Sequence, residues 1–375
     1  MKLIFSLLIA FAVICSAAMA ELIPIIDDNQ RLGYINQEGE VVIEPEYSQE
    51  ISYVRYIYNG DVYPGVEFPN YTYFKDGLAT VRKATKFLFF TLWNNYYVID
   101  TAGARVFKSG DNLVYNYSEG VAPIKYSDEN VGLHKPQKQW SWVDKTGAEF
   151  QPSKLRFAYV SQFKEGYALV LNDNNYGFID KSGNIIGSPS YEDATLFSEG
   201  LASVKIEGKW GYINNKGETV IKYRFDNASP FTGDIARVMD KGAYGYINKA
   251  GDLVIKPKYL WATDFSDGLA AVMVDKTQFG YIDKTGKLAV NGGFSMTRKF
   301  TEGLGCVEKD GKWGYINTKG AWVIEPQFDF AMSFNDGAAM VWTKNELRYI
   351  NKSGKTIATL LRGKDYVKVR QKLEP

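Results

Sequence analysis

A short phrase that recurs at a nearly constant spacing constrains the fold of this chain more than any other feature. It combines Gly, an aromatic residue, Ile and Asn or Asp, and from Gly177 onward its copies begin 34, 34, 35, 34 and 34 residues apart. Such a period indicates a repeat array, in which each small unit shares a core with its neighbours. The regular copies are Gly33–Asn36, Gly177–Asp180, Gly211–Asn214, Gly245–Asn248, Gly280–Asp283 and Gly314–Asn317, and looser copies begin at Tyr97, Ser141 and Arg348.

Each copy is followed by a fixed turn in which Gly stands three residues after the Asn or Asp, as in Asn214 and Gly217. The Asn or Asp side chain can bond the backbone two residues on, and Gly accepts the positive φ that the turn requires. All nine copies obey this rule, which predicts a hairpin built on a type I turn with a Gly bulge. The ligand spacing of a calcium or phosphate loop is absent, so we interpret the pattern as structural.

A second motif precedes each phrase and combines an aromatic residue, an acid and Gly, as in Phe197-Ser198-Glu199-Gly200. The strand that follows carries Ala and then Val two residues apart, which places both on one face toward the core. In a ring or a stack the acids would lie on one side, where they would either attract cations and basic partners or serve as solvated turn residues. They are Asp76, Glu119, Glu165, Glu199, Asp267, Glu302 and Asp336.

The unit at residues 201–231 illustrates the predicted fold. It reads as strands at 201–206, 209–214 and 218–222, followed by an irregular return that supplies at most a short fourth strand, and no segment predicts a convincing helix. The chain is therefore expected to be all-β, with about nine three-stranded units. A closed β-propeller is favoured because closure removes exposed sheet edges. An open β-solenoid is the alternative, because nine blades is high for one ring and the unit is lean for four strands.

Two units carry a resemblance to a known family. Residues 208–214 and 311–317 both read Gly-Lys-Trp-Gly-Tyr-Ile-Asn, which resembles the signature of the bacterial WG-repeat (KWG-repeat) family, and the likeness covers roughly residues 22–360. Other aromatic residues replace the Trp at Tyr176, Tyr244 and Phe279, and the first three units depart most. The resemblance implies exported or surface-associated β-repeat proteins, mostly without an assigned function, and it implies no catalytic residues.

The first 20 residues predict a cleaved signal peptide rather than part of the fold. Lys2 precedes the apolar run Leu3–Ile14, and Ala18-Met19-Ala20 matches a cleavage site, which leaves Glu21 as the mature N-terminus. A lipid anchor at Cys15 is the alternative. The expected organisation is then a repeat array at 21–362, irregular at 21–160 and regular at 161–362, with a basic C-terminal tail at 363–375. We expect export to the periplasm, the cell surface or the medium, with no membrane segment after cleavage.

The composition argues against several functions. Without Lys2 the chain keeps 43 of its 44 basic residues beside 43 acidic ones, so no charge footprint for nucleic acid is expected. Cleavage at Ala20 leaves Cys306 as the one Cys, which precludes an internal disulfide and suits packing better than nucleophilic catalysis. His134 is the only histidine and stands in a Lys- and Pro-rich segment. We therefore expect no enzyme, no metal site and no cofactor.

The departures from the repeat are the candidates for binding. Residues 48–73 are rich in tyrosine, residues 83–96 contain a run of Phe, Leu and Trp, and residues 126–139 lengthen the third unit. Segments grafted on a rigid scaffold commonly carry binding, and aromatics with wet polar edges suit sugar or protein contacts. Alternatively, these segments cap an open end of the array. The candidate binding residues are Tyr56, Tyr58, Tyr63 and Trp93.

The sequence thus favours a non-enzymatic exported binding or scaffold protein that mediates protein–protein interactions in a bacterial envelope. The expected partner is an envelope protein or a cell-wall glycan. A glycan-binding or cell-wall-binding repeat protein is the first alternative and requires aromatics along a groove. A propeller-type hydrolase or lyase is the second alternative and requires acids clustered in a central pocket.

Overall fold

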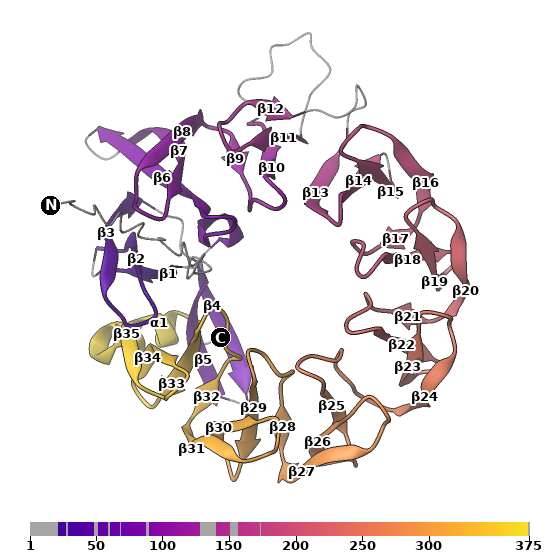
Figure 1. Ribbon diagram of the computed structural model, residues 1–375. Helices are drawn as coiled ribbons and strands as arrows, with labels where there is room; N and C mark the ends of the chain where they lie inside the picture. Colours follow the sequence, from indigo (N-terminus) through magenta and orange to yellow (C-terminus); the bar gives the residue numbers. More distant parts are fainter. Residues whose placement is uncertain are drawn as a thin grey trace, which may run out of the picture.

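The computed structural model of the protein describes residues 22–27, 29–48, 52–58, 61–67, 69–87, 90–127, 140–150, 157–172 and 174–373. Its strands form nine small antiparallel sheets that stand radially around a ring, and a further two-stranded hairpin. The first and last sheets lie side by side (Figure 1), and their strands β1 and β35 are in contact. The chain is therefore a closed nine-bladed β-propeller, which confirms the favoured prediction, and the open solenoid was wrong.

The first four blades contain the irregular part of the chain. Blade 1 comprises β1 (Ile23–Ile26), β2 (Arg31–Ile35) and β3 (Val41–Ser48), and the hairpin β4 (Ser52–Tyr58) and β5 (Asp61–Glu67) follows it. Next come the 3-10 helix η1 (Asn70–Thr72) and blade 2, with β6 (Leu78–Phe87), β7 (Phe90–Asp100) and β8 (Arg105–Gly110). Blade 3 comprises β9 (Leu113–Val114), β10 (Val121–Lys125), β11 (Trp140–Asp144) and β12 (Glu149–Phe150), and blade 4 comprises β13 (Tyr159–Lys164), β14 (Tyr167–Asn172), β15 (Asn175–Asp180) and β16 (Ile185–Tyr191).

The remaining five blades follow the regular pattern. Blade 5 comprises β17 (Asp193–Ala194), β18 (Leu201–Ile206), β19 (Lys209–Asn214) and β20 (Thr219–Phe225), and blade 6 comprises β21 (Asn227–Ala228), β22 (Ile235–Asp240), β23 (Ala243–Asn248) and β24 (Leu253–Tyr259). Blade 7 comprises β25 (Ala270–Met273), β26 (Phe279–Ile282) and β27 (Leu288–Phe294). Blade 8 comprises β28 (Met296–Thr297), β29 (Leu304–Lys309), β30 (Lys312–Asn317) and β31 (Trp322–Phe328), and blade 9 comprises β32 (Phe330–Ala331), β33 (Ala338–Thr343), β34 (Glu346–Asn351) and β35 (Thr356–Arg362). Six of the nine sheets thus have four strands, and in five of them the first strand has only two residues.

The pairing of strands gives each blade two distinct ends. In blade 5, β17 and β18 lie toward the ring centre and β20 toward the rim (Figure 1), and the register runs from Leu201 opposite Asn214 to Ile206 opposite Lys209. The acid-containing turn and the Asn-Gly turn therefore lie at one end, and the tight turn between β18 and β19 lies at the other. We call the two corresponding faces of the ring the acid-turn face and the hairpin face.

Two glycines of the repeat are required for different structural reasons. A Cβ on Gly211 would lie 2.5 Å from the Ile221 carbonyl oxygen, because the pairing of β19 with β20 is irregular there. Gly217 has φ +79° and its amide donates a 2.9 Å hydrogen bond to the Asn214 carbonyl, while the Asn214 side chain accepts one from the Lys216 amide at 3.0 Å. The predicted turn is confirmed.

The two sequence motifs meet across the boundary between neighbouring blades. The Tyr212 hydroxyl of blade 5 donates a 2.8 Å hydrogen bond to the Ser229 carbonyl of blade 6, and the Tyr212 ring lies 5.0 Å from the ring of Phe231. The Ala and Val predicted to face the core, such as Ala202 and Val204, are fully buried. The hydroxyl contact recurs from Tyr34 to Thr72, Tyr246 to Thr263, Tyr281 to Arg298 and Tyr315 to Met332, and the Trp142 indole makes it to Ser161.

The expectation that the chain contains no helix was wrong. Helix α1 (Gly363–Leu373) ends the described chain and contacts β4, β5, β34 and β35. Its apolar positions Tyr366, Val369 and Leu373 recur at helical spacing, and Tyr366 is buried. The charged residues and the exposed Val367 between them masked this pattern. No helix in the described ranges has the length and apolar character of a membrane span.

Candidate binding surfaces

The acids of the acid-turn face accept hydrogen bonds from the next blade. The Glu165 carboxylate of blade 4 accepts from the Glu199 amide at 2.6 Å and the Gly200 amide at 2.9 Å, and the Glu199 carboxylate accepts from the Asp234 amide of blade 6 at 2.8 Å. These contacts join successive turns and leave the acids poorly placed to gather around a ligand. Equivalent bonds run from Gly120 to Asp76, Gly166 to Glu119, Gly303 to Asp267 and Gly337 to Glu302.

Lysines strengthen several of these contacts. Lys249 lies 3.2 Å from Glu199 and 2.8 Å from Asp234, and Lys352 lies 2.9 Å from Glu302. Burial acts to raise the pKa of Glu199, but the amide of Asp234 and the ammonium of Lys249 outweigh it and hold that pKa below its ordinary value. The sequence left open whether the acids attract cations or stand as solvated turn residues. The structure gives them a third role, as braces between blades.

The departures from the repeat all emerge on the hairpin face. In blade 1 the hairpin β4–β5 follows Ser48, which pairs with Arg31, and in blade 2 the long ribbon turns between Phe87 and Phe90. In blade 3 the inserted segment lies between Lys125 and Trp140, and in blade 9 helix α1 follows Arg362, which pairs with Glu346. These positions correspond to the end of blade 5 at Ile206 and Lys209. In blades 9, 1, 2 and 3 the extra segments thus join the blade at the same face, and residues 128–139 of the blade 3 segment lie outside the described residues.

Three of the four candidate binding residues lie on one ribbon. Tyr56 pairs with Tyr63 across β4–β5, and Tyr58 pairs with Asp61. Because pairing partners and residues two positions apart share a face, positions 56, 58 and 63 lie on the same face of the ribbon. The ribbon also contacts α1, so its backbone is anchored to the last blade.

Trp93, the fourth candidate, lies on a separate ribbon. It pairs with Thr85 beside a β-bulge, where β6 and β7 are 10 and 11 residues long and project beyond the 6 residues of β18 and β19. The inserted segment at 128–139, with His134, lies outside the described residues. That these residues bind a partner stays a prediction, as does the alternative that they cap the ring.

A cluster of aromatic residues between blades 3 and 4 was missed by the sequence reasoning. The Trp140 ring lies 5.2 Å from the Tyr115 ring and 5.3 Å from the Tyr159 ring, measured between centroids. These three residues line a cavity of about 310 Å³ together with Asn116. The Asn116 Oδ1 atom is shielded from solvent and, among the described residues, accepts no hydrogen bond.

The repeat pattern alone does not reveal this cluster. Trp140 occupies the position of Trp210 and Trp313, which are buried, yet Trp140 is only partly buried. Burial raises the pKa of Tyr115 and of Tyr159, so both remain neutral phenols at physiological pH. The amine of Lys125 lies 6.0 Å from the Trp140 ring centroid. The cluster therefore offers aromatic faces, a buried acceptor and one cation.

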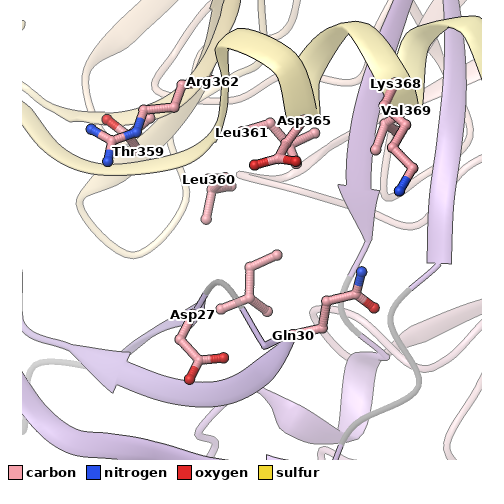
Figure 2. A pocket seen from close by; sticks show the side chains of 10 residues that line it. Asp27, Gln30, Thr359, Leu360, Leu361, Arg362, Asp365, Lys368 and Val369 are labelled. Atoms are coloured by element: carbon pink, nitrogen blue, oxygen red, sulfur yellow. The ribbon is translucent and has the colours of Figure 1, made fainter.

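A second cavity of about 430 Å³ lies on the hairpin face where the ring closes. Figure 2 shows Asp27 and Gln30 of the β1–β2 turn on one side and Asp365 and Lys368 of α1 on the other. Asp27 is already engaged by Arg31, whose amide and side chain donate to it at 2.7 Å and 2.8 Å. The lining contains both acidic and basic residues, which suits a packing contact between α1 and blade 1 better than a site for a charged ligand.

Sequence comparison decides the family. A family model described as "WG containing repeat" matches residues 33–56, 153–176, 176–210, 210–242, 244–277, 279–313 and 313–342, which together span more than half of the chain. The protein belongs to the WG-repeat family. The unmatched stretch between residues 56 and 153 coincides with blades 2 and 3, where the WG-repeat pattern is weakest. No curated protein sequence matches the chain.

One solved structure supports the fold of this WG-repeat protein, and two more distant ones are also similar. A crystal structure described as a eukaryotic initiation factor superposes with a TM-score of 0.57 at 11% identity, covering 91% of this chain and 95% of that chain. The C-terminal WD40 domain of Sif2 gives 0.37 at 10% identity, covering 74% and 91%, and apo AztD from Citrobacter koseri gives 0.34 at 11%, covering 72% and 92%. The first similarity supports the fold alone, and the other two are too distant to carry an argument.

The repeats offer few groups for catalysis. Cys306 is fully buried, and burial raises the pKa of its thiol to about 12, so it is not a nucleophile in the folded state. Within the described ranges, no three metal-ligating side chains cluster. Cys306 therefore serves packing, as its strand position indicated.

Proposed function

We propose that this WG-repeat protein is an exported, non-enzymatic scaffold that binds a protein of the bacterial envelope through the hairpin face of blades 9, 1, 2 and 3. The observation that carries the proposal is that the four departures from the repeat join their blades at the same face. A family of near-identical blades has no structural need for extra ribbons on neighbouring units. Concentrating them on one face builds a single broad surface, as a protein partner requires.

The braced ring gives that surface a rigid support. Neighbouring blades pack through buried aromatic residues, and many of these interfaces add a Tyr hydroxyl or a carboxylate, as between blades 5 and 6. The ribbons therefore stand on a base that does not need to be ordered when a partner binds. Aromatic side chains that are desolvated in an interface contribute on the order of 2 kcal/mol or more at hot spots. Tyr56, Tyr58, Tyr63 and Trp93 are the residues proposed to do so.

The test is a pull-down of detergent-solubilised envelope proteins with a variant in which these four residues become Ser. Binding should fall at least about tenfold while the melting temperature changes little. A matched control replaces Tyr223 and Tyr259, two partly buried tyrosines of the regular blades 5 and 6, with Ser and should keep binding. Survival of binding together with a collapse of stability would mean that the ribbons are a structural cap.

Glycan binding is the second candidate function, and the cluster of Tyr115, Trp140 and Tyr159 favours it. The apolar C–H face of a pyranose ring can stack on an indole or phenol, and its hydroxyls can donate to the buried Asn116 oxygen. A Trp140→Ala, Tyr159→Ala variant should then lose sedimentation with insoluble peptidoglycan, whereas the four-residue ribbon variant should retain it. The hydrolase or lyase alternative gains no support, because the acids it would use accept backbone hydrogen bonds.

Export is part of the proposal and rests on residues 1–20, which lie outside the described residues. N-terminal sequencing of protein recovered from the cell envelope or medium should give Glu21. A retained Met1 or a lipidated Cys15 would overturn this part of the proposal.

A further inference from the structure

The interface between blades 6 and 7 differs from six others on the acid-turn face. A carboxylate of one blade accepts an amide hydrogen bond from the turn of the next between blades 2 and 3, 3 and 4, 4 and 5, 5 and 6, 7 and 8, and 8 and 9. The turn of blade 6 reads Thr-Gly-Asp at residues 232–234, where blade 5 has Ser-Glu-Gly at residues 198–200. Gly233 therefore stands at the bracing position and offers no carboxylate to blade 7.

The turn of blade 7 nevertheless has the shape that binds a carboxylate elsewhere. Asp267 and Gly268 have φ +50° and +80°, close to the +57° of Glu199 and the +83° of Gly200. In blade 5 both amides of that turn donate to the Glu165 carboxylate, at 2.6 Å and 2.9 Å. Within residues 174–373, which the structure describes without a gap, neither the Asp267 amide nor the Gly268 amide donates a hydrogen bond. Successive amides in this conformation form a concave site for an anion.

A lysine lies beside these amides. Lys284, in the Asp-Gly turn of blade 7, donates from its ammonium to the Gly233 carbonyl at 2.6 Å. Lys181 of blade 4 makes the same bond to the Glu119 carbonyl at 3.0 Å, and its ammonium also lies 3.1 Å from the Glu119 carboxylate. Lys284 is exposed and, among the residues described, is in no ion pair. Its ammonium therefore stands where Lys181 meets a carboxylate.

The two nearest acids of these turns are held by other partners. The Asp234 carboxylate lies 2.8 Å from the Lys249 ammonium within blade 6. The Asp267 carboxylate accepts from the Gly303 amide of blade 8 at 2.7 Å, which directs it away from its own turn. The two amides of blade 7 and the ammonium of Lys284 thus remain available to a carboxylate from outside the chain.

We propose that the amides of Asp267 and Gly268 and the ammonium of Lys284 bind a carboxylate of a partner peptide, at the place that a brace carboxylate occupies in the six other interfaces. Two amides and one ammonium match the two oxygens and the charge of this group. The carboxylate belongs to an acidic side chain or to a free C-terminus, both of which backbone amides can capture. The site is on the acid-turn face, so the inference does not depend on the function proposed for the hairpin face.

The experiment records the amide signals of the isotope-labelled chain from Glu21 by TROSY NMR while a peptide is added. Acetyl-Ala-Glu-Ala-amide carries a side-chain carboxylate, acetyl-Ala-Ala-Ala carries a terminal one, and acetyl-Ala-Gln-Ala-amide carries none. The signals of Asp267 and Gly268 should shift saturably with at least one of the first two peptides, and the peptide that binds identifies the source of the carboxylate. The signals of Glu199 and Gly200 should stay unchanged, because their amides are already bonded.

Two variants test the residues of the site. Lys284→Met should weaken binding about tenfold, since it removes a charge-assisted hydrogen bond. Its matched control is Lys181→Met, which changes the equivalent lysine at a braced interface and should leave binding unchanged. Gly233→Glu should supply the brace and abolish the shifts, because φ at Gly233 is +61°, close to the value that Glu199 adopts. A Cβ at Gly233 would meet only the flexible end of Lys284, so Gly233→Ala should fold and keep binding.

Several results would overturn the proposal. One is an equal response at Gly200 and Gly268, and another is binding that survives Gly233→Glu. Equal shifts with the Gln peptide would show that the carboxylate is not what binds. Binding that appears only in Asp234→Asn would mean that Asp234 itself fills the site in solution.

Discussion

Blades 5 to 8 and blades 9 to 3 have the same architecture but use it differently. In the regular sector the motif Tyr of each blade donates a hydrogen bond to the next blade, and Trp313 is 1% exposed. In the irregular sector the corresponding Trp140 is partly exposed and lines a cavity. The repeat pattern therefore records contacts between blades, and its interruptions mark the positions that are released from those contacts.

Not every departure from the pattern releases a residue. Trp142 replaces the motif Tyr in blade 3, yet its indole donates a 2.9 Å hydrogen bond to the Ser161 carbonyl and its ring packs on Phe163. Both are the contacts that Tyr212 makes in blade 5. A residue that differs from the repeat pattern thus indicates a change in structure only when the contact made at that position is also lost.

The largest expected contrast between the two sectors concerns tryptophan. Trp313→Ala should lower the free energy of unfolding by about 3–5 kcal/mol, because it empties a buried site between blades 8 and 9. Trp140→Ala should cost roughly 1 kcal/mol, because part of that ring already faces solvent. Urea unfolding of both variants measures the difference, and equal losses would mean that the blade 3 cluster is part of the core.

Substitutions of the turn glycines can separate two causes of destabilisation, a clash with a neighbouring blade and a strained backbone conformation. Gly217→Val should destabilise the protein by roughly 2–3 kcal/mol, since the residue has φ +79° and its Cβ would lie 2.4 Å from the Gly187 Cα of blade 4. Gly286→Val and Gly320→Val should fall in the same range. The control is Gly208→Val, where φ is +75° but no atom lies within 4 Å, and thermal melts should show a smaller loss there. If all four variants behave alike, contact between blades is not what the turn glycines secure.

The Tyr hydroxyl contact can be removed without changing the ring. Tyr212→Phe should cost about 1 kcal/mol, because it leaves the Ser229 carbonyl without its partner. Blade 4 has Phe178 at this position, with its ring 4.9 Å from Phe197. Chemical denaturation of Tyr212→Phe and Phe178→Tyr should therefore move stability in opposite directions, and a neutral Tyr212→Phe would show that ring packing alone joins the blades.

The brace at Glu199 predicts the smallest effect, which depends on pH. Its pKa is lower in the folded protein than the ordinary value of 4.5. The brace therefore stabilises the fold fully above that value, and the contribution is lost as pH falls through the folded pKa. Glu199→Gln should melt below wild type at pH 7, and the gap should narrow below about pH 4. A gap that is independent of pH would assign the effect to packing.

Much of the fold was predictable because a repeat is local information copied many times. The nine Asn or Asp turns, the buried Ala202 and Val204 faces and the propeller all followed from spacing and from the preference for closed edges. The role of Glu199 was not predictable, because its partner amide at Asp234 lies on the next blade and only the curvature of the ring brings them together. Helix α1 was missed because part of its packing is on the β4–β5 ribbon, which is distant from it in sequence.

The candidate surface was predicted only in part. The tyrosine-rich insertion was recognisable as a departure from the period, but its location on the same face as the blade 2 ribbon and α1 depends on strand register. The cluster around Trp140 was hidden because a Trp at that position is a core residue elsewhere in the chain.

The closure between blades 9 and 1 has a consequence for the order in which the protein folds. Gln37 donates a hydrogen bond to the carbonyl of Asp336, a contact that joins residues 299 positions apart. Blades 5 to 8 can assemble one upon another as the chain is made, since each contact spans little more than one repeat. The interface between blades 9 and 1, by contrast, can form only after the final blade is present. Its formation costs the entropy of closing a loop that spans most of the chain. Until then the chain is an open arc with two uncovered ends, and we expect the meeting of its first and last strands to be the last step of folding.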